Sequence, residues 1–418
     1  MMRIKTVQDI ARQSRLASRQ LSSAPDAVRN LALQRMAEAL QAVKQQVLEV
    51  NALEVNAARE QGQSAALVKR LTIDEKTFNY MLSRLNKVAQ APDPLNRILA
   101  GHTNPAGLQV YKKSVPLGVI GIIYEARPNV TTDAAGVCIK SGNAVILRGG
   151  SEALQTNSVL TDAMIAGAVS AGLPEHAIQI IPIPGHEAVG ELLQMDDYID
   201  VLIPRGGKGL IKRIAEGTRI PVIKHYDGIC HLYIAADADP AQAVALAINS
   251  KCQSVQVCNA LETLLVDKQC AAQMLPLLAQ AFQARQIELR GCERTQQYLT
   301  AIEPASEADW HSEYLAPILS LKVVDGIDAA IEHINCYGSG HTDGIVTQSL
   351  QLARQFEQQV DSASVMINAS TRLSGGGDYG LGSVVGISTD KLHVRGPVGP
   401  GELTSYKWVA YGAGHLRD

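Results

Sequence analysis

The sequence predicts an α/β protein with two domains, each built on a parallel sheet that helices cover. Short apolar strands alternate with helical segments between residues 119 and 216, and the alternation resumes after residue 230. The chain has 418 residues, enough for roughly two to four domains. Hydrophobic residues make up 46% and charged residues 19%, which is typical of a globular protein with a large core.

The first hundred residues are expected to form helices. Pro25 suits a first helical turn, apolar residues recur at helical spacing after it, and Gly62 ends that pattern. Thr72 and Glu75 fit a capping box, which predicts a helix start. The alternating part that follows has expected strands at 119–124, 144–147, 178–181 and 201–203 and expected helices at 134–140, 152–171, 187–195 and 210–216.

The second alternating series begins after residue 230. Its expected strands are 232–234, 261–266, 318–324, 345–346 and 365–367, and its expected helices are 240–249, 269–285, 327–335 and 349–360. A segment rich in glycine and proline, 396–401, then precedes a single apolar strand at 406–409. Because one isolated strand contributes little to a core, we expect it to pair across a subunit boundary.

Composition and charge exclude several function classes. The net charge is −3 and aromatic residues make up only 4%, which argues against nucleic acid and favours a small-molecule substrate. The N-terminal residues lack the apolar segment of a secretion signal, and the longest apolar run, Val115 to Tyr124, is about half a membrane helix. We therefore expect no membrane segment and a cytoplasmic protein. Seven cysteines without a Cys-x-x-Cys pair predict neither a disulfide framework nor a metal site.

Two strand-to-helix turns combine glycine with basic residues: Arg148–Glu152, which contains Ser151, and Pro204–Gly209, which contains Arg205, Gly206, Gly207 and Lys208. Backbone amides and the helix dipole favour an anion at such turns, so the pair suggests a phosphate-bearing cofactor. Two ordinary glycine turns are the alternative. Gly375–Gly380 matches the dinucleotide fingerprint formally, but no helical pattern follows it, which favours a loop.

Cys258 lies in a loop just before an expected strand, whereas Cys138 lies on an apolar helix face. Loop ends over a rigid sheet are places where nucleophiles are displayed. The pattern alone leaves two interpretations open, a catalytic thiol and an inert one.

Five longer segments carry more specific motifs: Ile123–Val130, Lys140–Asn143, Val257–Ala260, Asn368–Arg372 and Leu403–Trp408. Together they resemble the gamma-glutamyl phosphate reductases of the aldehyde dehydrogenase superfamily, and the similarity covers nearly the whole chain. The resemblance implies an aldehyde-dehydrogenase-like fold of two parallel-sheet domains and a small oligomerisation arm. The implied parts are a cofactor domain at 1–107 and 119–234 with 380–392 returning to it, a catalytic domain at 235–379, and an arm of 108–118 with 393–418.

The activity that the resemblance implies is NADPH-dependent reduction of L-glutamyl 5-phosphate to L-glutamate 5-semialdehyde in proline biosynthesis. Phosphate leaves as a thioacyl-enzyme forms on Cys258. A homo-oligomer and glutamate 5-kinase are the implied protein partners. The alternative is a hydrolytic NAD(P)-dependent aldehyde dehydrogenase of the same fold; a non-catalytic scaffold is disfavoured because Cys258 and its flanks are intact.

The resemblance also assigns roles to single residues. Asn129 corresponds to the amide that holds the oxyanion, with Glu125 competing for the same register. Arg148 stands where the superfamily keeps a lysine at the adenosine ribose, and Glu313, in Glu-Tyr-Leu-Ala-Pro, matches the glutamate at the nicotinamide ribose. The turns described above, with Ser151, Glu152, Arg205, Gly206, Gly207 and Lys208, complete the cofactor set. The candidates for binding the amino-acid end of the substrate are Asn249, Lys251 and Arg372.

One difference from hydrolytic relatives concerns the segment Lys224–Gly228. Hydrolytic aldehyde dehydrogenases carry a Glu-Leu-Gly-Gly element whose glutamate activates water, and the corresponding position here is His225. A reductase is expected to lack that base, because water would destroy the thioacyl intermediate. An imidazole that acts as a base and a purely structural histidine both remain open for His225.

Overall fold

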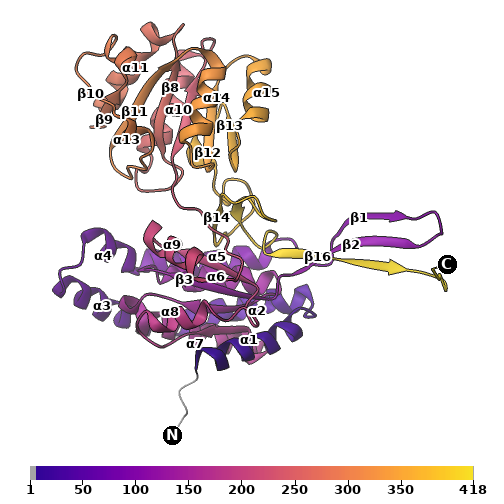
Figure 1. Cartoon of the computed structure of the whole chain (residues 1–418). Helices are drawn as coiled ribbons and strands as arrows, with labels where there is room; N and C mark the ends of the chain where they lie inside the picture. Colours follow the sequence, from indigo (N-terminus) through magenta and orange to yellow (C-terminus); the bar gives the residue numbers. More distant parts are fainter. Residues whose placement is uncertain (1–5, 418) are drawn as a thin grey trace. The chain divides into compact units, whose positions relative to one another are not determined.

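The computed structural model describes residues 6–417, which divide into two compact units (Figure 1). The first unit runs up to Lys224 and also includes Gly380–Ile387 and the chain from Leu392 onward. The second unit consists of His225–Tyr379 and Ser388–Lys391. The boundary between the two units therefore follows Lys224 rather than residue 234. Strand β7 (Cys230–Ile234) belongs to the second unit because it pairs with two strands of the second sheet.

The first unit begins with five helices, α1 (Val7–Leu21), α2 (Asp26–Ala42), α3 (Lys44–Glu60), α4 (Ala65–Leu71) and α5 (Glu75–Gln90). The helical stretch expected from Pro25 to Gly62 is present as two helices, because Val43 ends α2 and precedes α3. The capping box expected at Thr72 is wrong. Helix α5 is capped by Asp74, whose carboxylate accepts from the Thr77 amide, while the Thr72 hydroxyl donates to the Val68 carbonyl at the end of α4.

The sheet of the first unit has four parallel strands in the order β5-β4-β3-β6. They are β3 (Val119–Tyr124), β4 (Ala144–Arg148), β5 (Ile178–Ile180) and β6 (Val201–Arg205). Every residue of β3 is buried, as expected for a parallel strand with both faces covered. The connecting helices are α6 (Asn129–Lys140), α7 (Leu154–Ser170), α8 (Glu187–Leu192) and α9 (Lys208–Gly217), with a short 3₁₀ turn, η1 (Ser151–Ala153), before α7.

A three-stranded antiparallel sheet of β1 (Ile98–Thr103), β2 (Gln109–Pro116) and β16 (Thr404–Tyr411) extends beyond the helices of the first unit (Figure 1). The sequence analysis missed β1, whose residues are all exposed. Strand β16 pairs with β2 of its own chain along its whole length. A separate two-stranded sheet joins β14 (Gly386–Ser388) and β15 (Gly396–Val398).

The second unit contains a seven-stranded parallel sheet in the order β10-β9-β11-β8-β7-β12-β13. Besides β7, its strands are β8 (Leu261–Asp267), β9 (Glu288–Gly291), β10 (Glu303–Pro304), β11 (Ile318–Val324), β12 (Thr342–Val346) and β13 (Ser364–Ile367). Its helices are α10 (Pro240–Cys252), α11 (Ala271–Gln283), α12 (Glu293–Gln296), α13 (Glu307–Trp310), α14 (Gly326–Tyr337) and α15 (Leu350–Gln359). The short strands β9 and β10, at one end of this sheet, escaped prediction because charged residues interrupt their apolar pattern.

Two edges of these sheets carry the polar residues of interest. In the first unit, Arg148 and Arg205 are the last residues of β4 and β6, at the carboxyl edge. In the second unit, the loops that contain His225, Cys258 and His341 each precede a strand and so meet at the amino ends of β7, β8 and β12. Within residues 6–417, no helix has the length and apolar character needed to cross a bilayer.

Candidate active site

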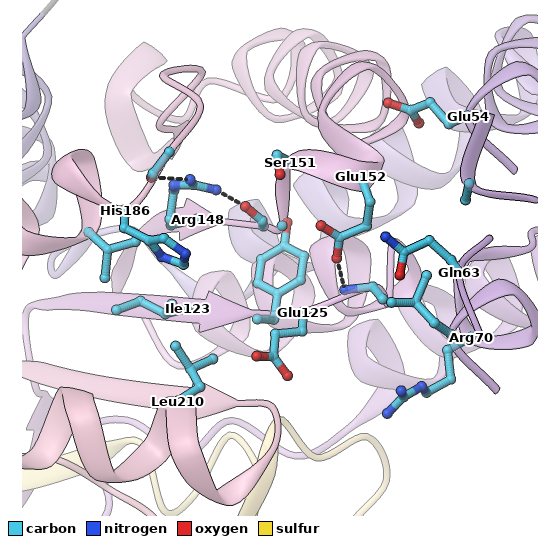
Figure 2. Close-up of a pocket in the computed structure, with 18 of the residues that line it drawn as sticks. Glu54, Gln63, Arg70, Ile123, Glu125, Arg148, Ser151, Glu152, His186 and Leu210 are labelled. Atoms are coloured by element: carbon cyan, nitrogen blue, oxygen red, sulfur yellow. Dashed lines mark hydrogen bonds between the residues drawn. The ribbon is translucent and has the colours of Figure 1, made fainter. Parts of the chain in front are cut away.

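The carboxyl edge of the first sheet opens into a cavity of about 690 Å³ (Figure 2). Three of the predicted cofactor residues line it, Arg148, Ser151 and Glu152. Arg148 is nearly buried, and its guanidinium donates to the carbonyls of Gly185, at 2.8 Å, and Gly149. Burial lowers the pKa of this guanidinium. Its Nε is buried without a hydrogen-bond partner.

Two carboxylates hold the amides around this cavity. Glu152 accepts a hydrogen bond of 2.6 Å from the Ala126 amide after β3 (Figure 2). Glu125 accepts one of 2.9 Å from the amide of Gly207, the N-cap residue of α9. The N-terminus of α9 therefore already has an anionic partner from the protein itself.

The second predicted turn does not open into this cavity. Arg205 instead lines a neighbouring cavity of about 450 Å³ in the same unit, together with Asn129. Gly206, Gly207 and Lys208 are exposed and line neither cavity. The cationic residues that line the cavity of Arg205 and Asn129 are Lys69, Arg70, Arg84, Arg127 and Arg205.

Asp133 is the single acidic residue in the lining of this second cavity. It accepts a hydrogen bond of 2.6 Å from Arg84, and Asn129 also contributes a hydrogen bond to it. Burial raises the pKa of this carboxyl against the opposing effect of Arg84. With five cations and one acid, the cavity around Asn129 favours an anionic group.

At the amino edge of the second sheet, the backbone of Gly228 packs directly against that of Cys258. A Cβ on Gly228 would lie 1.8 Å from the Cys258 carbonyl oxygen, so only glycine allows this approach. The Gly228 amide donates to Glu313 at 2.9 Å, and the Cys230 thiol donates to the Cys258 carbonyl at 3.2 Å. The structure thus brings Cys258 and Glu313 together through the Gly228 backbone.

Two histidines lie beside the Cys258 thiol. Sγ of Cys258 and one ring nitrogen each of His225 and His341 all lie within 4.8 Å of one another. Burial, with His225 nearby, lowers the pKa of His341 to about 3, so its imidazole is neutral at physiological pH. His341 is therefore a weak base.

The three candidate substrate-binding residues have different environments. Asn249 is exposed on α10. Arg372 donates through Nε to Gln253 at 2.9 Å, and its guanidinium interacts electrostatically with Cys258. Burial lowers the pKa of Arg372.

Lys251, by contrast, is fully buried, and its ammonium donates to Glu262 at 2.5 Å. The other oxygen of Glu262 accepts from the Leu315 amide at 3.2 Å, two residues after Glu313. Burial raises the pKa of Glu262 to about 7, against the opposing effect of Lys251. This pair therefore supports the loop that carries Glu313, and the Lys251 ammonium is not presented to a substrate.

Sequence reasoning missed Gly228, Glu262 and His341 as parts of this site. A charged residue inside the apolar strand 261–266 is a signal that could have identified Glu262. No pattern marks His341, because its neighbours in the site come from segments about 80 and 115 residues away. The Gly375–Gly380 segment forms turns, as expected for a loop rather than a helix start.

Comparisons with known proteins agree with this architecture. The model of the aldehyde dehydrogenase family matches residues 2–297 and 299–380. A gamma-glutamyl phosphate reductase from Thermotoga maritima is 37% identical, covers 99% of this chain and 100% of its own, and superposes with a TM-score of 0.97. The gamma-glutamyl phosphate reductase of Saccharomyces cerevisiae is 29% identical over 100% of both chains, with a TM-score of 0.55.

A more distant structure, an acetylating aldehyde dehydrogenase from Geobacillus thermoglucosidasius, shares 19% identity over 99% of this chain and 97% of its own, with a TM-score of 0.68. At that identity the similarity concerns the fold alone. The match to the family model and the full-length similarity at 37% identity go further. The chain belongs to the aldehyde dehydrogenase family, in the branch of the gamma-glutamyl phosphate reductases.

Proposed function

We propose that this protein reduces L-glutamyl 5-phosphate to L-glutamate 5-semialdehyde and releases phosphate, with NADPH as the reductant. The observation that carries the proposal is the full-length similarity, at 37% identity, to a gamma-glutamyl phosphate reductase. The contacts of Gly228 support it, because its backbone packs against Cys258 and its amide donates to Glu313, which brings a thiol and a carboxylate from separate loops together.

The first unit has features that fit a dinucleotide. The cavity beside Arg148 has the size of a small-molecule site, and η1 and α7 begin at its edge. The buried, unpaired Nε of Arg148 is a donor that a ligand oxygen can use. We assign Arg148, Ser151 and Glu152 to the adenosine half, and Arg205, Gly206, Gly207, Lys208 and Glu313 to the rest of the cofactor. The bound cofactor supplies the hydride.

The chemistry of the chain's own residues follows from an acyl phosphate, which is a good electrophile with a good leaving group. The Cys258 thiolate attacks the carbonyl carbon, the C–O bond to phosphate breaks, and a thioester forms. By the family resemblance, Asn129 and the Cys258 amide are assigned to the oxyanion of the tetrahedral intermediate, and Glu313 to the orientation of the hydride donor. Reduction of the thioester would be the cofactor's contribution, and the part of Cys258 is then to leave as the thiolate, as its C–S bond breaks and the aldehyde is released.

The lack of a carboxylate at position 225 favours a reductase over a hydrolytic enzyme. A hydrolytic enzyme needs a carboxylate that activates water beside the thiol, and His225 stands at that position here. His341 has a pKa of about 3 and is too weak a base for that step. Glu262 is occupied by Lys251 and by the Leu315 amide.

The test is the reverse reaction in defined buffers. Enzyme, L-glutamate 5-semialdehyde and NADP⁺ should form NADPH only when phosphate or arsenate is present as the acyl acceptor. NAD⁺ in place of NADP⁺ should turn over more slowly. Sustained turnover to free glutamate without phosphate would instead establish the hydrolytic aldehyde dehydrogenase.

We further propose a homo-oligomer assembled through the arm, working in the cytoplasm. Strand β16 is an edge strand, and Tyr406, Trp408 and Tyr411 on it are about half exposed, which suits pairing with a second copy. Free thiols, including the exposed Cys336, suit a reducing compartment. Removal of residues 396–418 should lower the mass measured by light scattering, and an unchanged mass would contradict the assembly.

A further inference from the structure

Three side chains from segments far apart in the sequence converge at the amino ends of β7, β8 and β12. The sulfur of Cys258 and one ring nitrogen each from His225 and His341 lie within 4.8 Å of one another. The two imidazole rings pack edge to face, with their centroids 5.6 Å apart. One thiolate and two imidazoles form a ligand set that zinc binds in proteins, with a fourth position left for water.

The cluster has nearly the dimensions of such a site. Zn–S bonds of about 2.3 Å and Zn–N bonds of about 2.1 Å place tetrahedral ligand atoms roughly 3.5 Å apart. All three separations are within 4.8 Å, so they exceed that spacing by at most about 1.3 Å. Cys258 and His225 are only partly buried, so rotations of their side chains can supply this contraction.

A chain of hydrogen bonds fixes the protonation of the buried member, His341. Ser374 donates to the Thr371 carbonyl, which can only accept. Ser374 therefore accepts from the Thr342 hydroxyl at 2.8 Å, and Thr342 in turn accepts from Nδ1 of His341 at 2.8 Å. This leaves the proton of His341 on Nδ1 and a lone pair on Nε2.

The lone pair on Nε2 of His341 accepts no hydrogen bond from the described residues. His341 is 1% exposed, and its buried Nε2 has no hydrogen-bond partner among residues 6–417. A buried polar atom without a partner is uncommon and costs free energy that a ligand can recover. The second shell is also in place, because metal-bound histidines usually donate their other N–H to an oxygen, as His341 does to Thr342.

We propose that His225, Cys258 and His341 form a binding site for a zinc ion, which masks the reactive thiol reversibly. Binding replaces the S–H bond of Cys258 with a Zn–S bond, and the proton passes to solvent. The positive charge of Arg372, which interacts with Cys258, weakens the site relative to a structural zinc centre, so a chelator removes the ion. The masking of catalysis rests on the proposed function, whereas the metal site itself does not.

The experiment uses the full chain, freed of metal by a chelator and kept reduced. Equilibrium dialysis with Zn²⁺ and metal analysis give the stoichiometry, and Co²⁺ serves as a spectroscopic probe. We expect one ion per chain and, with Co²⁺, a thiolate charge-transfer band in the near ultraviolet together with intense tetrahedral d–d bands. Cys258→Ala should remove the charge-transfer band, and His225→Gln should weaken binding at least tenfold.

His341→Gln should weaken binding at least as strongly, but its burial makes a folding check by circular dichroism necessary. The matched control is His333→Gln, because His333 is also buried with an unpartnered Nε2 but lies outside the cluster. Cys336→Ser, at an exposed thiol, controls for adventitious binding. Both controls should bind zinc like the unaltered protein.

The outcomes separate this inference from the proposed function. Zinc binding that persists in Cys258→Ala and in His225→Gln, or no saturable binding at all, would overturn the site. If the ion binds as described but the protein lacks reductase activity, the site stands and the proposed function fails. If both hold, zinc should inhibit the reductase, a chelator should restore it, and His225→Gln should need at least tenfold more zinc for the same inhibition.

Discussion

The two units present their polar residues at opposite edges of parallel sheets. In the first unit, Arg148 and Arg205 end their strands, and the polar groups line open cavities with glycine turns and backbone amides. In the second unit, Cys258 and His341 precede their strands, and buried side chains are tied to one another and to the backbone.

This difference teaches how the two sites should respond to mutation. An open cavity lined by separate groups loses binding energy when one group is removed, but it keeps its fold. A buried network loses stability or reaction geometry, because each removed group leaves a partner unsatisfied. Changes at the cavity beside Arg148 should therefore appear in KM, and changes in the buried network of the second unit in kcat and in unfolding.

The largest expected effect is on the nucleophile. Cys258→Ala should lower turnover at least about 10³-fold, because no other group can form the thioester. Cys336→Ser, at an exposed thiol of the same unit, and Cys230→Ser, whose thiol has its pKa raised well above the ordinary value by burial, should both keep most of the activity. Steady-state assays with folded variants measure these turnover rates. If Cys230→Ser lost turnover while Cys258→Ala stayed active, Cys230 and not Cys258 would be the nucleophile.

The next largest effect is expected on stability, at the buried pair of Lys251 and Glu262 that contacts the loop carrying Glu313. Lys251→Met leaves the Glu262 carboxyl buried without its cation and should destabilise the second unit by about 3–5 kcal/mol. The double variant Lys251→Met/Glu262→Gln should recover much of that loss. Calorimetry measures both, with Lys268→Met as the control, since Lys268 pairs with Asp325 at the exposed surface, where ion pairs contribute little to stability. Equal unfolding temperatures for Lys251→Met and Lys268→Met would show that the buried pair of Lys251 and Glu262 does not stabilise the second unit.

A smaller effect is expected at Glu313. In Glu313→Gln the side-chain carbonyl can still accept from the Gly228 amide, so the loop is kept while the charge is lost. We expect kcat to fall by roughly 10²-fold through misplacement of the hydride donor, with a smaller change in KM. Deuterated NADPH provides the measurement, since the isotope effect should grow, and Glu307→Gln is an exposed control. An isotope effect and kcat like those of the unaltered enzyme would exclude a role in hydride transfer.

The smallest effect is expected at the open cavity. Arg148→Ala removes the guanidinium that joins the turns at Gly149 and Gly185, and KM for NADPH should rise about tenfold while kcat changes little. Arg148→Lys keeps a cation at this position, so its KM for NADPH should rise less than that of Arg148→Ala. If Arg148→Ala lowered kcat more than Glu313→Gln does, the contrast between the two edges would break down.

The sequence by itself predicted the two parallel α/β units, because buried strands leave an apolar pattern that does not depend on distant contacts. It located Cys258 and both glycine turns, and the resemblance gave them roles. The sequence predicted local details less well. It assigned the cap of α5 to Thr72 although Asp74 is an equally suitable N-cap residue, and it gave no sign of the interruption at Val43 or of the exposed strand β1.

Only the tertiary structure decided which polar residues meet. In the folded chain, Arg148 and Arg205 line different cavities, and Lys251 donates a hydrogen bond to Glu262. The tertiary structure also joined His225, Cys258 and His341, which no spacing along the chain connects. The physical reason is that strand order in a parallel sheet, β8-β7-β12, is set by crossover packing, and this order brings together three loops that the sequence keeps far apart.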